Sequence, residues 1–298
     1  MVVAVDRGRF QVEMADLGEH AEPIGAVKAR VLGRKGIVVG DRVEVVGVES
    51  ASPDSAARIV RRLERSTVLR RSADDEDPTE RVVVANATQL AIVTAAASPD
   101  PNLELIDRAV IAADDAGIPV LIIVTKTDLA PDSAIRMAYQ PLGIDVLQVR
   151  AGDPENGIRD RLIGEVTVVF GPSGVGKSTL VNALIPGALR TTGGVNAVTG
   201  KGRHTSTSVR AIALAPRGWI IDTPGVRSLG LAHIPPQGIV HAFPDLPEVL
   251  EHCPRDCGHD GDDCALLQWS LTQDLAVQAR ITSMCELLVA ARRRASTP

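Results

Sequence analysis

The chain has 298 residues, more than a typical single domain of about 150, so we expect two or three domains. Apolar residues make up 45% and charged residues 23% of the sequence, which fits a folded globular protein and excludes collagen-like and wholly disordered chains. The 32 basic and 37 acidic residues give a net charge of −5, so any contact with nucleic acid must be regional.

The apolar segments predict neither a secretion signal nor a membrane span. Asp6 and Arg7 interrupt the N-terminus before an apolar core of signal length, and no 18 apolar residues run together. Three of the four cysteines lie close together with a histidine, which is typical of a metal site in a reducing compartment. We therefore expect a cytoplasmic protein without membrane contact.

Residues 1–68 are predicted to be β-rich. The segments 9–14 and 26–32 alternate between apolar and polar residues, and 36–48 is predicted to form two strands split by a Gly-Asp turn. Short strands with glycine turns and no long helix indicate a small β-barrel, for which the oligonucleotide-binding type is one candidate.

A sharp separation of charge follows the predicted barrel. We assign residues 69–80 to a linker or mobile loop. The basic residues are either a solvated strand edge or a contact to RNA phosphates, and the sequence leaves both open. The arginines are Arg58, Arg61, Arg62, Arg65, Arg70 and Arg71, and the acids that follow are Asp74, Asp75, Glu76, Asp77 and Glu80.

Residues 81–232 are predicted to form an α/β domain. Continuous apolar runs at 89–95, 119–124, 166–170 and 219–221 are typical of strands buried on both faces of a parallel sheet. Residues 233–298 are predicted to form a helical, zinc-binding domain that ends in an Ala/Leu-rich helical segment at about 266–293.

The run GPSGVGKST follows an apolar strand and precedes the helical LVNALI, so it fits G-x-x-x-x-G-K-[ST] in its required context. Glycines let backbone N–H groups point at phosphates, Lys177 reaches the β- and γ-phosphates, and the Ser178 hydroxyl is a Mg²⁺ ligand. The predicted nucleotide-binding residues are Gly171, Pro172, Ser173, Gly174, Val175, Gly176, Lys177, Ser178 and Thr179.

A second element, Asp-Thr-Pro-Gly, follows the apolar run at 219–221. Asp222 at a strand end beside a phosphate loop can hold Mg²⁺ through water, and Gly225 allows the backbone to approach the γ-phosphate. The same four residues also form ordinary turns, so this motif indicates a nucleotide site only in combination with the phosphate loop.

Selection of the base is predicted at Thr125, Lys126, Asp128 and Leu129, directly after an apolar run. The Asp128 carboxylate can accept two hydrogen bonds from guanine, which adenine cannot supply, so it favours GTP over ATP. The alternative is a helix N-cap aspartate after a strand.

In this chain the base-selecting motif precedes the phosphate loop, the reverse of the usual order in P-loop GTPases, so the domain resembles a circularly permuted GTPase. With a β-barrel in front and a Cys/His cluster behind, the whole chain resembles the ribosome small-subunit-dependent GTPase A family. This resemblance implies GTP hydrolysis to GDP and phosphate during late maturation of the small subunit, stimulated by the subunit. The implied partners are 16S-type rRNA and ribosomal proteins, and we expect a monomer.

The resemblance also assigns residues between the phosphate loop and Asp222. The family's Gly-Arg-His-Thr-Thr-Thr signature is matched by residues 202–207, so Thr205 or Thr207 would meet Mg²⁺ and the γ-phosphate. Val226 occupies the place of a water-orienting Gln, which leaves His204 as the catalytic candidate or as a ribosome contact.

Cys253, Cys257, His259 and Cys264 form a C-x3-C-x-H-x4-C pattern. Three thiolates and one imidazole complete a closed tetrahedral Zn²⁺ site, so a structural zinc is predicted, with unbound buried cysteines as the alternative. The spacing of these ligands differs from the usual family spacing. Two further positions differ from the family pattern: Thr125 stands where Asn is usual, and Arg150 stands where Ser is common. Cys285 is predicted to be a core residue.

Two other functions remain open from the sequence. One is a metabolic P-loop ATPase or kinase, against which the paired Thr-Lys-Thr-Asp and Asp-Thr-Pro-Gly motifs argue. The other is a non-enzymatic RNA-binding module that holds GTP as a structural ligand, which Val226 would permit.

Overall fold

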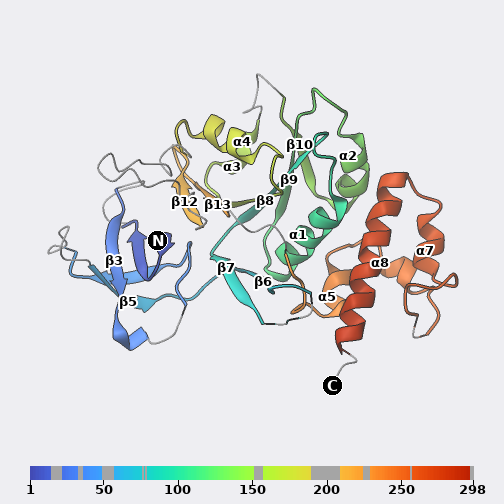
Figure 1. The fold of residues 1–298 in the computed structure, drawn as a ribbon, viewed down its shortest axis with the longest axis horizontal. Coiled ribbons are helices and arrows are strands. Elements are labelled where there is room, and N and C mark those ends of the chain that lie inside the picture. The colour runs from blue at the N-terminus through green and yellow to red at the C-terminus, as the bar shows by residue number, and fades with distance from the viewer. Residues whose placement is uncertain are drawn as a thin grey trace, which may run out of the picture.

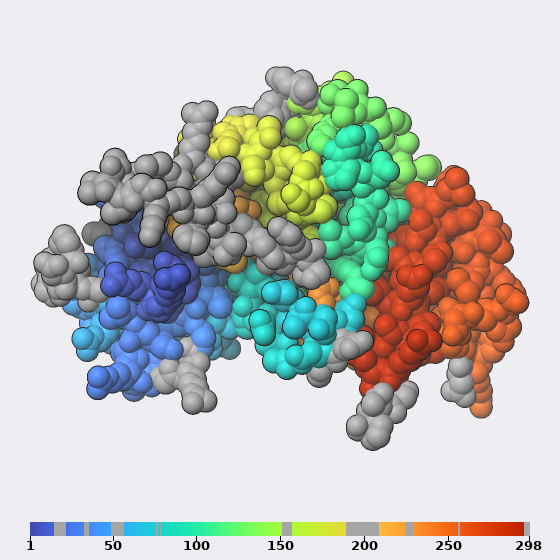
Figure 2. All heavy atoms as spheres, in the orientation of Figure 1, coloured from blue at the N-terminus to red at the C-terminus, as the bar shows by residue number. Residues whose placement is uncertain are grey.

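The structure is a computed structural model that describes residues 1–14, 22–32, 36–48, 57–75, 77, 79–150, 157–188, 209–223, 229–255 and 257–295. The N-terminal strands lie at one end, a sheet flanked by helices lies in the middle, and the C-terminal helices lie at the other end (Figure 1). The space-filling view shows the same order, with the blue and red parts at opposite ends of the molecule (Figure 2).

The N-terminal strands form a small barrel. Their order is β1-β2-β3-β5-β4, with β3 and β5 parallel. The Val2 N–H donates to Asp41 O and the Gly40 N–H donates to Val2 O, each over 2.9 Å, which brings β1 to the segment before β4. This arrangement fits the predicted small β-barrel, and its five strands suit the oligonucleotide-binding type. The strands are β1 (Val2–Asp6), β2 (Arg9–Val12), β3 (Ile24–Lys28), β4 (Val43–Val46) and β5 (Ala57–Arg62).

The prediction of two strands in 36–48 is wrong, because only β4 forms there. The backbone of residues 38 and 39 makes hydrogen bonds outside any strand pairing. The Ala85 N–H donates to Val39 O over 3.1 Å, and the Val38 N–H donates to the Asp41 carboxylate over 2.8 Å. A Cβ on Gly40 would lie 1.9 Å from Ala85 O, so only glycine fits at this approach. The strand predicted at 26–32 also ends early, at Lys28, before the 3-10 helix η2 (Arg30–Leu32).

The segment expected as a linker begins as a strand. β6 (Val68–Arg71) pairs antiparallel with β7 (Arg81–Ala85), and Ser72 then forms an isolated antiparallel bridge with Gly230. Residues 69–75 are therefore attached to the middle of the molecule.

The central sheet has the strand order β10-β9-β8-β11-β13-β12. All neighbouring pairs are parallel except β12 with β13, as the continuous apolar runs predict. β1 pairs antiparallel with β12 at Ala4 and Arg210, which joins the barrel to this sheet. The strands are β8 (Gln89–Ala95), β9 (Val120–Thr125), β10 (Asp145–Gln148), β11 (Val166–Phe170), β12 (Arg210–Ala213) and β13 (Trp219–Asp222).

Helices cover both faces of the sheet, and β8 shows the division. Leu90 and Ile92 belong to the core beneath α1 (Leu103–Asp115) and α2 (Ser133–Tyr139), whereas Ala91 and Val93 belong to the core beneath α3 (Ile158–Leu162) and α4 (Lys177–Leu184). A short 3-10 helix, η3 (Gln140–Leu142), follows α2. A strand buried on both faces carries apolar side chains toward both of them, which explains the absence of alternation in the sequence.

The C-terminal helices share a core with the central domain. α8 (Leu275–Ala295) contacts α1 and α2, and Ile281, Met284 and Leu288 pack in one cluster with Ile106 and Tyr139. Among the described residues, no helix combines the length and apolar content that a membrane span requires. The other helices of this segment are α5 (Pro236–His241), α6 (Pro247–Leu250) and α7 (Ala265–Ser270).

A buried arginine reinforces this attachment. The Arg280 side chain on α8 is almost fully buried, pairs with the Asp245 carboxylate, and has its guanidinium carbon 5.4 Å from the centroid of the Phe243 ring. A charge held so deeply requires a partner, because an uncompensated buried charge is strongly destabilising.

Candidate nucleotide site and metal cluster

The predicted nucleotide motifs meet at one edge of the sheet. The phosphate loop follows β11, the Thr-Lys-Thr-Asp motif begins at the end of β9, and Asp222 is the last residue of β13. Since these strands are parallel, their carboxyl ends lie together, which is where open α/β sheets bind ligands.

Glycines shape the phosphate loop as its motif predicts. A Cβ on Gly171 would lie 2.1 Å from Val93 O, and Gly174 and Gly176 have φ angles of +83° and +92°. Only glycine adopts all three positions without strain. Gly176 is the N-cap of α4, so the N-terminal N–H groups of this helix are presented beside the loop, the arrangement that binds anions.

Lys177 lies folded over the phosphate loop. Its Nζ donates to Gly171 O over 2.6 Å and to Pro172 O over 2.7 Å. Burial lowers the pKa of Lys177, and the nearby negative charge of Asp222 offsets part of this shift. Burial likewise raises the pKa of Asp222, and the positive charge of Lys177 offsets part of that shift. Two partly desolvated charges of opposite sign beside a glycine loop have the chemistry that a polyphosphate and its divalent cation require.

Thr125 connects the base-selecting motif to the phosphate loop. Its hydroxyl donates to Val175 O over 2.5 Å and lies 3.2 Å from Thr94 O. The departure from Asn at this position therefore keeps a side-chain contact between the two loops, made by a hydroxyl in place of an amide.

A cavity of about 430 Å³ opens beside Asp128 and is lined also by Leu129, Asp132, Gln148 and Arg150. Asp128 and Leu129 are exposed, so the carboxylate is available to a ligand. No sequence motif singled out Asp132 or Gln148. Gln148 Nε2 donates to Asp132 Oδ1 over 3.1 Å, and Arg136 Nε donates to Asp132 Oδ2 over 2.7 Å, which stiffens the wall of the cavity.

The loop after β8 is a further neighbour that the motifs do not reveal. Lys126 donates from Nζ to Ser98 O, and a Cβ on Gly174 would lie 3.8 Å from Pro99 Cδ. The position of β8 between β9 and β11 could have indicated this, because its carboxyl end reaches the same edge of the sheet.

Some predicted residues lie outside the described part of the chain. They are His204, Thr205 and Thr207 of the Gly-Arg-His segment, and Gly225 and Val226 after Asp222. Their assignments remain predictions.

The predicted metal ligands come together. The thiols of Cys253, Cys257 and Cys264 and a ring nitrogen of His259 all lie within 4.8 Å of one another. Sγ of Cys253 is 4.0 Å from Sγ of Cys264, and His259 Nδ1 is 3.9 Å and 3.6 Å from these two sulfur atoms. Sulfur ligands on a tetrahedral Zn²⁺ with bonds of about 2.3 Å lie about 3.8 Å apart, so the cluster fits a zinc ion.

The protonation equilibria of the cluster act in opposite directions. Burial lowers the pKa of His259, which favours the neutral imidazole that binds metal, whereas burial raises the pKa of Cys264 to about 11, so a metal ion would have to displace the proton of this thiol. Cys285 is buried in the core, as predicted.

Comparison with known proteins is consistent with this geometry. The family model described as RsgA GTPase matches residues 62–232. The Small ribosomal subunit biogenesis GTPase RsgA of Pseudomonas aeruginosa is 39% identical over a 242-residue alignment that covers 78% of this chain and 69% of that protein. The protein of the same name from Azotobacter vinelandii is 38% identical over 78% of this chain and 68% of its own length.

Two solved structures share the fold. YjeQ from Thermotoga maritima has a TM-score of 0.68 at 22% identity, covering 97% of both chains. YloQ, a circularly permuted GTPase, has a TM-score of 0.67 at 24% identity, covering all of this chain and 95% of its own. With the family match and the P. aeruginosa relative, these findings identify the chain as a GTP-hydrolysing P-loop enzyme of circularly permuted fold that belongs to the RsgA GTPase family.

Proposed function

We propose that this GTPase binds the small ribosomal subunit and hydrolyses GTP to GDP and phosphate there during late subunit maturation. The observation that carries the proposal is the meeting of Thr125 with the phosphate loop beside the Asp128 cavity, in a chain whose relatives are named for small ribosomal subunit biogenesis. We place the activity in the cytoplasm, where such a partner would be found, with the chain acting as a monomer.

In this proposal the phosphate loop binds the nucleotide through its backbone N–H groups and Lys177. Lys177 exchanges its two carbonyl contacts for the β- and γ-phosphates and neutralises charge that develops during phosphoryl transfer. Ser178, Asp222 and Thr205 would hold Mg²⁺, which would neutralise charge on the phosphates when bound. Gly225 would approach the γ-phosphate, and His204 would orient the attacking water in place of the apolar Val226.

The two ends of the molecule supply the proposed ribosome contacts. Arg58 and Arg61 are exposed on β5 of the barrel, where RNA phosphates can reach them. Arg65 stabilises the barrel instead, because it forms an ion pair with the buried carboxylate of Asp41 over 2.7 Å. We assign the barrel (1–68) and the C-terminal helical domain (233–298) to rRNA and ribosomal-protein contacts around the GTPase domain (81–232), with 69–80 as the connection.

We further propose that the Cys/His cluster holds one structural Zn²⁺. About one equivalent of zinc should copurify, and Cys257→Ser should lose the metal and loosen the helices after residue 235, while nucleotide binding stays largely intact. Metal analysis, thermal unfolding and GDP binding of the same preparations check this. The matched control is Cys285→Ala, a buried cysteine outside the cluster, which should keep its zinc. Metal-free wild-type protein with an unchanged melting profile would contradict the zinc assignment.

The other two functions are less well supported. An ATPase or kinase would not need the carboxylate of Asp128 at the cavity, and the family and relatives of this chain are named as GTPases, which argues against a module that only holds GTP.

Co-sedimentation with purified small subunits tests the proposal. We expect binding in the presence of a non-hydrolysable GTP analogue that falls steeply as salt rises, because cationic side chains displace counterions from RNA. His204→Ala should retain GTP binding and subunit binding and lose most of the subunit-stimulated hydrolysis. Absence of binding at low salt would overturn the ribosomal assignment, whereas full stimulation in the His204 variant would remove only that residue from the mechanism.

A further inference from the structure

The segment that carries Asp128 is held at both of its ends by neighbouring residues of one part of the sheet. At the first end, the Thr127 N–H and hydroxyl both donate to Val149 O, over 3.4 Å and 3.1 Å. At the second end, Gln148 Nε2 donates to Asp132 Oδ1 over 3.1 Å. Gln148 is the last residue of β10 and Val149 follows it, so the end of β10 fixes the segment at two points.

The side chain of Asp132 contacts β10 instead of capping its own helix. Asp132 is the N-cap residue of α2, where an aspartate side chain usually accepts a hydrogen bond from the backbone of the first turn, but here it makes no such bond. Its carboxylate is buried, with Oδ1 bound to Gln148 and Oδ2 bound to Arg136 Nε over 2.7 Å. A buried carboxylate with a partner on each oxygen is held in one orientation.

The neighbours of Gln148 determine which way its amide points. A carboxylate paired with Arg136 only accepts hydrogen bonds, so the NH₂ group of Gln148 must face Asp132. On the other side, Gln148 Oε1 lies 3.5 Å from Nη2 of Arg150, a group that only donates. The contact between Asp132 and Gln148 is therefore directional, and a second carboxylate in place of the amide could not make it.

The backbone beside these contacts has a conformation that needs support. Lys126, directly before Thr127, has a φ angle of +55°, in the left-handed region that residues other than glycine seldom adopt. Such a conformation persists where the surrounding structure enforces it, and it is common at ligand sites. Here the Thr125 hydroxyl is bound to Val175 O and the Thr127 hydroxyl to Val149 O. Contacts on both sides thus hold the backbone of the base-selecting motif in this geometry.

Asp128 itself has an exposed side chain and lines the cavity of about 430 Å³. Among the residues that the structure describes, none forms a hydrogen bond or an ion pair with its carboxylate. The carboxylate is therefore a free acceptor on a segment that is fixed at two points. Preorganisation of this kind reduces the cost of ordering the site when a ligand binds.

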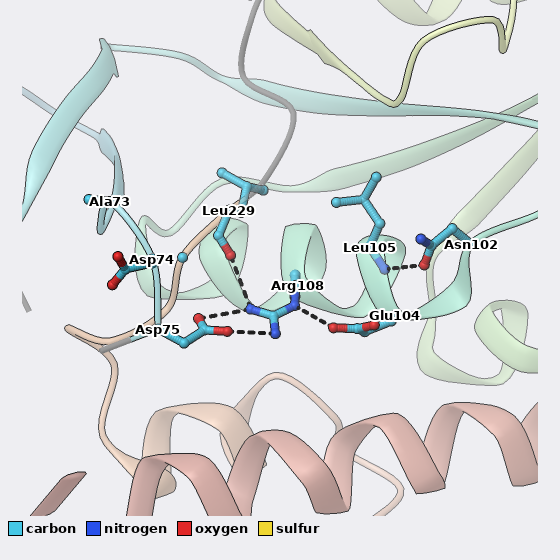
Figure 3. Close-up of a pocket in the computed structure, with 9 residues that line it drawn as sticks. Ala73, Asp74, Asp75, Asn102, Glu104, Leu105, Arg108 and Leu229 are labelled. Carbon is cyan, nitrogen blue, oxygen red and sulfur yellow. Dashed lines mark hydrogen bonds and ion pairs between the residues drawn. The ribbon is translucent and has the colours of Figure 1, made fainter. Parts of the chain in front are cut away.

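A second cavity shows the contrasting case. It has a volume of about 310 Å³ beside α1, and Figure 3 shows the Arg108 guanidinium there between Asp75, Glu104 and the Leu229 carbonyl. Arg108 binds the two carboxylate oxygens of Asp75 over 2.9 Å and 2.7 Å, and it binds Glu104 over 2.9 Å. The guanidinium of that cavity is occupied by protein groups, whereas the carboxylate of Asp128 is available to a ligand.

We propose that Asp132 and Gln148 are positioning residues for base selection: their hydrogen bond holds the Asp128 carboxylate where both nitrogen donors of guanine reach it. The proposal rests on the proposed role of Asp128 in base selection. A two-pronged contact depends on orientation more than a single hydrogen bond does, so a displaced carboxylate loses first the bond to the 2-amino group of guanine.

The test is the preference for GDP over inosine diphosphate, which has the N1–H of guanine and lacks its 2-amino group. The wild-type chain should prefer GDP about tenfold or more, the scale of one hydrogen bond to a charged group. Asp132→Asn leaves one oxygen for two donors, and Gln148→Glu places two carboxylates face to face. Each variant should lower the preference about fivefold or more, as measured by equilibrium binding of both nucleotides.

The double variant Asp132→Asn/Gln148→Glu rebuilds the contact with amide and carboxylate exchanged. The amide at position 132 can donate to the carboxylate at position 148 and keep its oxygen for Arg136. The preference should return to within about twofold of wild type, which independent effects of the two changes would not produce. The control Asp145→Asn removes only an exposed ion pair with Arg161 at the start of β10 and should keep the wild-type preference.

A wild-type preference in either single variant would overturn the proposal, as would a double variant in which the two losses multiply. If the affinities for both nucleotides fall together with the melting temperature at an unchanged ratio, the contact is merely structural, which also overturns it. Asp128→Asn, measured in parallel, should lose the preference. If that variant kept it, or the wild-type chain lacked it, base selection by Asp128 would fail and this proposal with it. No ribosomal subunits are present, so a failure of the proposed ribosomal function would leave these outcomes unchanged.

Discussion

Lys177→Ala is expected to abolish GTP hydrolysis and to weaken triphosphate binding. Lys177 lies over the phosphate loop, where its Nζ contacts the carbonyl groups of Gly171 and Pro172, so the ammonium is close to the loop that we propose binds the β- and γ-phosphates. Removing a group that neutralises charge in the transition state should lower kcat by at least about a hundredfold. Phosphate release in single-turnover conditions measures this directly.

Lys28→Ala on β3 of the barrel is the matched control for Lys177→Ala. It removes a lysine from another part of the molecule and should leave intrinsic hydrolysis unchanged. Persistence of wild-type turnover in Lys177→Ala would show that GPSGVGKST is not the active loop.

Asp128→Asn is expected to reverse the preference of the site among nucleotides. A carboxylate accepts from the two nitrogen donors of guanine, whereas an amide can donate to the C2 carbonyl of xanthine. GTP binding should weaken by at least about a hundredfold, because a site built for these hydrogen bonds leaves polar groups unpaired with the wrong partner. Competition binding with GTP, ATP and xanthosine triphosphate measures the change.

The control for this variant is Asp160→Asn, an exposed aspartate on α3 away from the cavity, which should keep the guanine preference. Unchanged guanine selectivity in Asp128→Asn would remove Asp128 from the site.

Local sequence patterns predicted the part of the fold that positions the nucleotide site. The predicted runs at β8 and β11 match the strands residue for residue, because burial on both faces selects a nearly continuous series of apolar residues. The glycine spacing of the phosphate loop also has a local cause, since the backbone conformation at Gly174 and Gly176 requires glycine itself.

Contacts between distant segments account for what the sequence could not predict. Residues 36–39, Gly-Ile-Val-Val, have the β-branched composition of a strand, but their backbone hydrogen bonds go to Ala85 and to the turn at Asp41. The contacts of Arg108 with Asp75 and Leu229 likewise join residues that no periodicity relates. Asp75 was part of an acidic segment whose composition indicates only a solvated linker.

The most direct test of the account is phosphate release from GTP by the purified full chain, with and without purified small ribosomal subunits at two salt concentrations. The account predicts slow hydrolysis by the protein alone, because Val226 cannot orient water, and strong stimulation by subunits at low salt that declines as salt rises. No stimulation at low salt, or equal hydrolysis of ATP under the same conditions, would contradict it.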